Sequence, residues 1–300
     1  MSSEALAKED CAFHARASDG SRQITSPMSD DLSPYRAAAA ALEQAPAFDA
    51  AVVQLAADMA GFYKTYPEAA AMFADVGQLA IVSGLLALPA PVTEADLCRL
   101  VGAGALASRQ RVRNHIANLE RAGLARIRDG DDGHIRPIVA TPDLEGLLNR
   151  WVGALAGAAA DLCNVDKDAL ARAELARFYL RQVMASHQAG FSAFSATPAV
   201  ARLVNLSRGH ALVLDLLAAS LRTGASEVAF SRRAFSTAYN VSRTHVIDLL
   251  SECEATGIIT PTTTQTLSLS ETFLAEARHW AAINFVLAAA TLEGRLMAVL

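Results

Sequence analysis

The sequence predicts a mainly α-helical protein in which two similar units follow one another, each with a helix–turn–helix, a small β-hairpin and long flanking helices. Three observations indicate this fold class. The chain of 300 residues is 52% hydrophobic and only 6% aromatic, and its abundance of Ala and Leu favours helices. One pattern of residues recurs 134 positions further along the chain, at Ser108 and again at Ser242. In both copies the apolar residues are spaced as on one face of a helix.

The charge and the cysteine content narrow the class of protein. The formal net charge is −5, from 26 basic and 31 acidic side chains, so any nucleic acid would have to bind through a local basic patch. The four cysteines lie far apart without metal-ligand spacing, which is typical of reduced thiols. The start of the chain lacks a basic-then-apolar signal segment. We therefore expect a cytoplasmic protein without a membrane segment.

The expected elements follow in order along the chain. Residues 1–33 mix small polar, charged and Pro residues, which predicts a disordered leader. The uncharged run Val76–Val92 contains Gly84 and two prolines, which indicates a buried core helix and not a membrane span. The first unit covers 34–162, with helices at 34–45, 48–65, 67–88, 93–102, 107–122 and 142–162 and a hairpin at 124–140. The second unit covers 168–300, with helices at 168–189, 197–206, 208–222, 231–238, 242–256 and 270–299 and a hairpin at 257–269.

The two units are predicted from an internal repeat. The segments Ser108–Val112 and Glu120–Leu124 match Ser242–Val246 and Glu254–Ile258 without a gap. Upstream the offset falls to 131–132, where Pro67 corresponds to Pro198 and Gly77 to Gly209. A slowly drifting offset is what duplication followed by small loop changes would leave. Chance similarity in an Ala- and Leu-rich chain explains it less well.

Each copy has the residues of a helix–turn–helix followed by a hairpin. In the first copy Ser108 caps a helix whose Val112, Ile116 and Leu119 share one face, and Gly123 ends that helix. Two alternating segments, 124–127 and 135–139, then flank a turn rich in Asp and Gly, as in a β-hairpin. The second copy repeats this order. A short helix packed across a longer one and followed by a hairpin, the wing, is the winged-helix arrangement.

The pattern S-R-x-x-V, seven residues, then E-x-x-G-L/I, with a wing and a long helix, resembles bacterial winged-helix regulators of the MarR type. Residues 67–150 and 198–285 carry the resemblance, and the segments 119–124 and 139–146 come closest to it. The resemblance implies a transcriptional regulator that binds duplex DNA. Since such regulators dimerise to place two recognition helices on two half-sites, it also implies that the tandem units mimic that pair within one chain.

The polar side chains of 109–121 lie opposite the apolar face of the predicted helix. They are of the types that read base edges, since Arg recognises guanine and Asn or Gln recognises adenine. We predict DNA contacts in the first unit from Arg109, Gln110, Arg111, Arg113, Asn114, Asn118 and Arg121 on the helix and from Arg126, Arg128 and Arg136 on the hairpin. The alternative is an ordinary solvated helix face. An acidic wing tip with Asp129, Asp131 and Asp132 disfavours phosphate there.

The predicted contacts of the second unit are weaker. They are Arg232, Arg233, Ser242, Arg243, Thr244 and His245. Asp248 stands where the first unit has Asn114, and Glu252 follows it. An Asp can accept a hydrogen bond from cytosine N4, but two acids on a groove face also fit a unit that has lost DNA binding. The sequence leaves open whether this unit contacts DNA or serves as a dimer-like scaffold.

The sequence has no catalytic motif such as GxSxG, HExxH or a phosphate-binding loop, and its seven histidines lack metal-ligand spacing. We therefore expect no enzyme, no cofactor and no metal. His115 lies on the predicted recognition helix, where packing is favoured over a contact to phosphate. The rival interpretation is a protein-interaction adaptor that keeps the winged-helix fold without DNA binding, which the acidic net charge favours. A small-molecule effector among the long helices, or another regulatory protein, is a further predicted partner. Whether two chains associate is left open.

Overall fold

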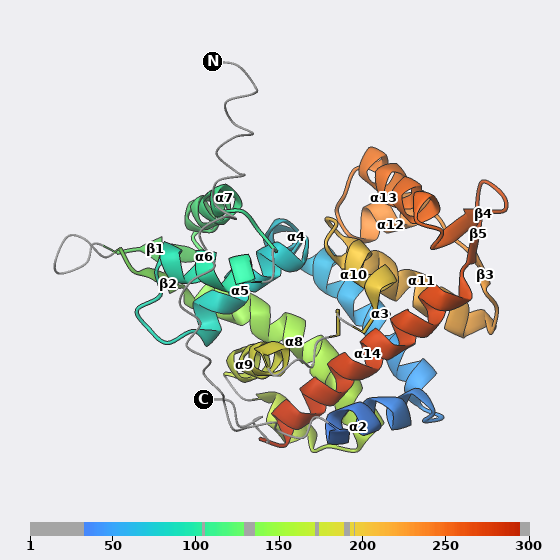
Figure 1. The fold of residues 1–300 in the computed structure, drawn as a ribbon, viewed down its shortest axis with the longest axis horizontal. Helices are drawn as coiled ribbons and strands as arrows, with labels where there is room; N and C mark the ends of the chain where they lie inside the picture. Colours follow the sequence, from blue (N-terminus) through green and yellow to red (C-terminus); the bar gives the residue numbers. More distant parts are fainter. Residues whose placement is uncertain are drawn as a thin grey trace, which may run out of the picture. The chain divides into compact units, whose positions relative to one another are not determined.

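The protein is mainly helical, with two small antiparallel sheets (Figure 1). The structure, a computed structural model, describes residues 33–103, 106–128, 136–171, 174–188, 193–194 and 196–294. These residues form 13 α-helices, one short 3-10 helix, a two-stranded hairpin and a three-stranded sheet. The predicted helical class with small β-elements is confirmed. Residues 1–32 of the predicted leader lie outside the described residues.

The first half of the chain contains the elements α2 to α8. They are α2 (Ser33–Glu43), α3 (Phe48–Thr65), α4 (Pro67–Met72), α5 (Val76–Ala87), α6 (Glu94–Ala103), α7 (Arg109–Arg121), β1 (Ala125–Ile127), β2 (Ile138–Ala140) and α8 (Pro142–Cys163). The single helix expected at 67–88 is wrong, since α4 and α5 are separate. The break occurs because the Asp75 carboxylate accepts a hydrogen bond from the Gln78 backbone N–H at 3.0 Å and so starts a new helix.

The second half contains the elements η1 to α14. They are η1 (Lys167–Ala171), α9 (Leu175–Gln188), α10 (Pro198–Val204), α11 (Gly209–Thr223), β3 (Glu227–Ala229), α12 (Arg232–Ala238), α13 (Arg243–Ala255), β4 (Ile259–Pro261), β5 (Thr266–Leu269) and α14 (Glu271–Leu292). The expected helix at 168–189 is wrong at its start, where η1 precedes α9. Strand β3 was not predicted from the sequence; it pairs antiparallel with β5 so that Val228 lies opposite Leu267. The sheet order is therefore β3-β5-β4.

Equivalent positions of the sequence repeat have the same local structure. Helices α7 and α13 are both 13 residues long, and the hydroxyls of Ser108 and Ser242 cap them by accepting from the N–H of the third residue along. Each helix is followed by a glycine with positive φ, 72° at Gly123 and 70° at Gly257. The closing helices α8 and α14 are both 22 residues long.

The two halves exchange helices. Helix α3 of the first half packs on α11, the core helix of the second, and on α8. Helix α9 of the second half packs in turn on α5, the core helix of the first, and on α8 and α14. The long closing helices α8 and α14 pack on each other, and α2 packs on α14. The predicted division into 34–162 and 168–300 stays a prediction, although the helices of each half lie on the other.

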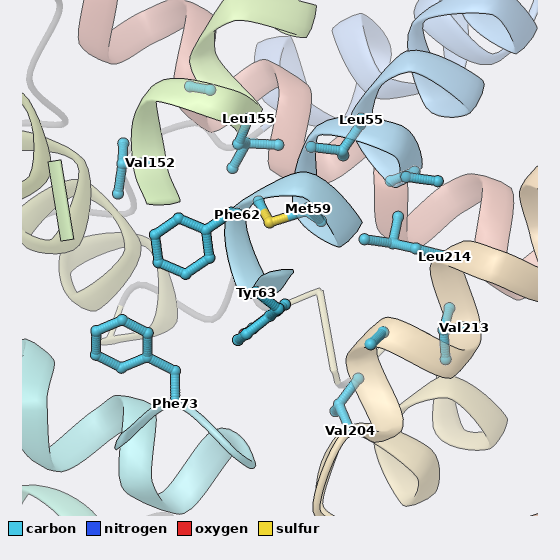
Figure 2. Close-up of a cluster of buried hydrophobic side chains, with 14 of the residues drawn as sticks. Leu55, Met59, Phe62, Tyr63, Phe73, Val152, Leu155, Val204, Val213 and Leu214 are labelled. Atoms are coloured by element: carbon cyan, nitrogen blue, oxygen red, sulfur yellow. The ribbon is translucent and has the colours of Figure 1, made fainter. Parts of the chain in front are cut away.

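One hydrophobic core results from this exchange. Phe62 and Tyr63 of α3 lie between α8 and α11, with Leu155 on one side and Leu214 on the other (Figure 2). All four side chains are at most 7% exposed, so apolar surface from both halves is removed from water at the same place. Within the run Val76–Val92, residues Val76–Ala87 form the largely buried helix α5, and the helix ends before Pro89. Among the described residues no helix is both long and apolar enough to cross a membrane.

Substitution of Gly209 tests the close packing at the start of α11. A Cβ at this position would lie 1.5 Å from the carbonyl oxygen of Leu203, which belongs to the preceding helix and cannot move alone. We expect Gly209→Ala to lower the free energy of unfolding by about 2 kcal/mol or more in urea denaturation followed by circular dichroism. Gly61→Ala is the matched control, because nothing lies within 4 Å of its Cβ. Inside helix α3 this Ala should be neutral or stabilise by up to about 1 kcal/mol. Equal effects of the two substitutions would contradict the packing argument.

Candidate nucleic-acid interface

Helix α7 separates an apolar inner face from a polar outer face. Val112, Ile116 and Leu119 are buried, as the sequence predicts, because their spacing places them on the side that packs on the core. The predicted contact residues all lie exposed on the opposite side or on the hairpin: Arg109, Gln110, Arg111, Arg113, Asn114, Asn118, Arg121, Arg126, Arg128 and Arg136. All the first-half candidates are therefore exposed to solvent, and we call the outer side of α7 together with the described part of its hairpin the α7 face.

Three arginines of the α7 face contact acids of their own half. The Arg111 guanidinium pairs with the buried carboxylate of Asp75, and the Arg113 Nε donates to Glu94 Oε1 at 2.7 Å. The Arg109 Nε lies 3.9 Å from the same Glu94 oxygen. Arg111 and Arg113 remain 42% and 52% exposed, so these pairs orient the side chains without removing them from solvent.

The remaining polar side chains of the α7 face fall into two groups: those on the helix bond to each other, and the arginines of the hairpin have no acidic partner among the described residues. Gln110 donates its amide to Asn114 at 2.8 Å, and Arg121 donates to Asn118 at 2.8 Å. Among the described residues, Arg126, Arg128 and Arg136 form no ion pair. The predicted acidic wing tip, Asp129 to Asp132, lies outside the described residues.

Helix α13 carries the second group of candidates. Arg232 and Arg233 at the start of α12, and Arg243 and Thr244 at the start of α13, are exposed. Two other candidates have structural roles. The Ser242 hydroxyl caps α13, and the ring Nε2 of the half-buried His245 lies 2.7 Å from the carbonyl oxygen of Ser207.

The contacts of His245 and Arg111 occupy equivalent positions in the two halves. Arg111 and His245 are 134 positions apart, and each contacts the residue two places before the glycine at the start of its own core helix, Asp75 or Ser207. The Arg208 backbone N–H donates to the Ala74 carbonyl at 2.5 Å, so the two loops also contact each other. A continuous path of polar contacts therefore joins α7 to α13.

Three partners of the candidate residues were not predicted from the sequence: Asp75, Glu94 and Ser207. Only Asp75 had a sequence signal, because an Asp immediately before an apolar helix is a typical N-cap. Glu94 lies 19 positions from Arg113 and Ser207 lies 38 positions from His245, so no local periodicity relates them.

A buried polar cluster lies beside this path, at the contact between the halves. Arg208 is 4% exposed, and its Nε donates to the Tyr239 carbonyl at 3.3 Å. The Tyr63 hydroxyl lies 2.8 Å from the His210 Nε2, and the Tyr239 hydroxyl donates to Asp215 at 2.7 Å. Burial, assisted by the Arg208 charge, lowers the pKa of His210 to about 3, so this ring is neutral at physiological pH.

His115 lies on the buried side of α7, as expected from the sequence. It is 2% exposed, and neither ring nitrogen has a hydrogen-bond partner among the residues that the structure describes. Burial lowers its pKa to about 4; the Asp75 charge opposes this shift and the Arg111 charge adds to it. His115 is therefore a neutral core side chain, and it cannot reach a ligand at the α7 face.

The small-molecule effector predicted among the long helices stays a prediction. A cavity of about 530 Å³ lies where α8 and α14 end, and it is open to solvent and lined by acidic residues such as Asp166, Asp168 and Glu293. A smaller one of about 200 Å³ lies between α10, Ile258 and Glu276. Within the described part of the chain, no three His, Cys, Asp or Glu side chains are grouped as metal ligands.

Comparison with known proteins adds no further assignment. No protein-family model matches the chain, and neither a curated protein nor a solved structure is significantly similar to it.

The pH dependence of stability tests the burial of His115. Its pKa is near 6.5 when unfolded and about 4 when folded, so between these values the unfolded chain binds a proton that the folded protein does not. Stability from this group is therefore complete above about pH 6.5 and falls as the pH falls towards 4. We expect His115→Leu, which places the residue of the equivalent position Leu249 at this site, to retain roughly 2 kcal/mol more stability than the wild type at pH 4.5 relative to pH 7. Urea unfolding at both pH values measures this difference.

His210 remains in both proteins, so its own contribution cancels in this comparison. Identical losses of stability in the wild type and in His115→Leu between pH 7 and pH 4.5 would show that His115 is not the titrating group.

Proposed function

We propose that the protein is a sequence-specific transcriptional regulator that binds duplex DNA through two winged-helix units within one chain. The observation that carries this proposal is the placement of α7 and α13. In Figure 1 both helices lie at the same edge of the molecule, and each is flanked on its outer side by its hairpin, β1–β2 or β4–β5. A pair of helices presented in this way is the arrangement by which helix–turn–helix dimers address two half-sites.

The local order of elements supports the winged-helix part of the proposal. In the second half α11, β3, α12, α13, β4 and β5 follow one another, with the strands ordered β3-β5-β4 beside the helices. In the first half α5, α6, α7, β1 and β2 repeat this order. In the first half the Val92 carbonyl accepts a hydrogen bond from the Ile138 backbone N–H at 2.8 Å. This contact on β2 stands where β3 pairs with β5 in the second half. In this fold the second helix of the pair enters the major groove.

The charges of the α7 face support duplex DNA as the partner. On the α7 face Arg109, Arg111 and Arg113 are exposed beside the amides of Gln110 and Asn114, which suits contacts to phosphates and to base edges. Arg126, Arg128 and Arg136 extend this charge along the hairpin. The net charge of −5 restricts binding to such a patch, so the affinity would depend on fit to the groove as well as on charge.

The second candidate function is a protein-interaction adaptor that has lost DNA binding. The observation that favours it is that Arg111 and Arg113 already have acidic partners, Asp75 and Glu94, while α13 exposes Asp248 and Glu252. An adaptor would show no duplex binding at low salt and a stable complex with another protein. Titration with duplex DNA at low salt therefore distinguishes the two functions.

Titration of labelled duplex DNA tests the α7 face. We expect the triple change of Arg111, Arg113 and Arg128 to Ala to weaken binding at least about tenfold and to reduce the slope of log affinity against log salt by up to about 3, because each lost phosphate contact releases one counterion fewer. Arg36→Ala is the control, because Arg36 is exposed on α2, at the opposite edge in Figure 1. Unchanged affinity in the triple variant would reject the proposed interface.

A gain of affinity is expected from Asp75→Asn. The Asn side chain can still cap α5 through Gln78 N–H, but it no longer attracts the Arg111 guanidinium by charge, so Arg111 contacts a phosphate without first losing an ion pair. We expect affinity to rise a few-fold at low salt. The same titration measures it, with a thermal melt to show that the fold is kept. A loss of affinity in a folded variant would contradict this account of Asp75.

A further inference from the structure

The two outer faces differ at positions that the repeat makes equivalent. Arg113 on α7 corresponds to Ile247 on α13, and Asn114 corresponds to Asp248, each 134 positions later. The first residue of the preceding helix also differs, since α6 begins with Glu94 and α12 begins with Arg232. Helices α7 and α13, which have the same length and the same N-terminal cap, therefore carry different side-chain chemistry on their outer faces.

In the first half the acid orients the arginine. Glu94 accepts a hydrogen bond from the Arg113 Nε at 2.7 Å, and among the described residues the two terminal amino groups of Arg113 have no partner. A guanidinium held at Nε keeps these two donors available for the O6 and N7 acceptors of guanine. The Gln110 amide, already aligned with Asn114, lies one turn away on the same face. This half is suited to a purine-rich block containing guanine.

In the second half an apolar side chain takes the place of the arginine. Ile247 is 45% exposed. Among the described residues, Val139 is the one other large hydrophobic side chain with comparable exposure. Burying such a side chain against an apolar group is favourable, and the major groove offers one such group, the C5-methyl of thymine. Asp248 beside it is exposed and can accept from the amino group of cytosine.

The positions of Asp248 and Glu252 along α13 are compatible with a contact between Ile247 and thymine. Recognition helices contact base edges chiefly through their N-terminal residues, and Ile247 and Asp248 are in the first half of α13. Glu252 is one turn further towards the C-terminus. The cations Arg232 and Arg233 at the start of α12 and Arg243 at the start of α13 are exposed, and within the described residues they form no ion pair, which suits contacts to phosphates.

We propose that the protein reads a duplex without two-fold symmetry: α7 selects a guanine-containing block through Arg113, with Glu94 as its positioning residue, and α13 selects a thymine-containing block through Ile247. This inference rests on the proposed DNA-binding function and adds the nature of the target to it. A homodimer of identical units reads a palindrome, whereas these two faces cannot make the same contacts in both half-sites.

Selection of bound sequences from a randomised duplex library, with the full chain as bait, tests the proposal. We expect the wild type to enrich two separated blocks that are not inverted repeats of each other. Arg113→Ala should lower the preference for one guanine at least about fivefold, the discrimination expected for one base pair, and leave the other block unchanged. Glu94→Gln should weaken the preference at that same guanine by a smaller factor and leave the other block unchanged, which a purely structural role of Glu94 would not do.

Ile247 is tested in the same selection. Ile247→Ala should reduce the preference for thymine in the second block about fivefold, and Ile247→Val, which keeps a branched apolar group, should restore most of it. Since Ile247 is exposed, neither variant should shift the thermal midpoint. Arg36→Ala should enrich the same sequences as the wild type.

The outcomes separate the proposal from the function on which it rests. Enrichment of a palindrome, or a uniform loss of affinity for all sequences in Ile247→Ala, would overturn the asymmetric target while leaving DNA binding in place. If the wild type enriches no sequence at all, the proposed function itself fails, and the inference fails with it.

Discussion

The exchange of helices between the two halves is the constraint on which the rest of the structure depends. Helix α3 covers the core helix α11 and helix α9 covers the core helix α5, so each half completes its apolar packing with an element of the other. Phe62 and Tyr63 lie in this shared interior, and Arg208 joins it to the loop at Ala74. Because tightly packed interiors adopt few alternative arrangements, the exchange also fixes the placement of α7 relative to α13.

Local structure was predictable where a few residues determine it. Ser108 and Ser242 begin α7 and α13, and Gly123 and Gly257 follow them, because a capping hydroxyl and a residue with positive φ act within one turn. The three-residue strand β3 was not predictable, since its pairing with β5 depends on residues about 40 positions away. The exchange of α3 and α9 leaves no periodic signal either. The apolar stripe of a helix shows that a partner exists but not which one.

In the candidate site, too, local features were predictable from the sequence and long-range contacts were not. Sequence periodicity placed the arginines of α7 on its exposed side, because the apolar residues occupy the other side. It did not predict that Asp75 and Glu94 contact two of these arginines, nor that His245 contacts the Ser207 backbone. These partners come from loops and helix ends that only the folded chain brings near α7 and α13. Residue type therefore indicated the chemistry of the surface, and the tertiary structure determined how its charges are neutralised.

The covalent connection between the exchanged halves has a consequence for assembly. In a dimer of separate subunits, an interlocked interior forms only when two chains meet, so its population depends on protein concentration and on competing paralogues. Here residues 164–166 link α8 to η1 and so join the halves, and the interlocked interior forms at any dilution with a fixed one-to-one stoichiometry. Each half is also released from the requirement that it fit a copy of itself, so that different side chains, His115 and Leu249, occupy matching buried positions of α7 and α13.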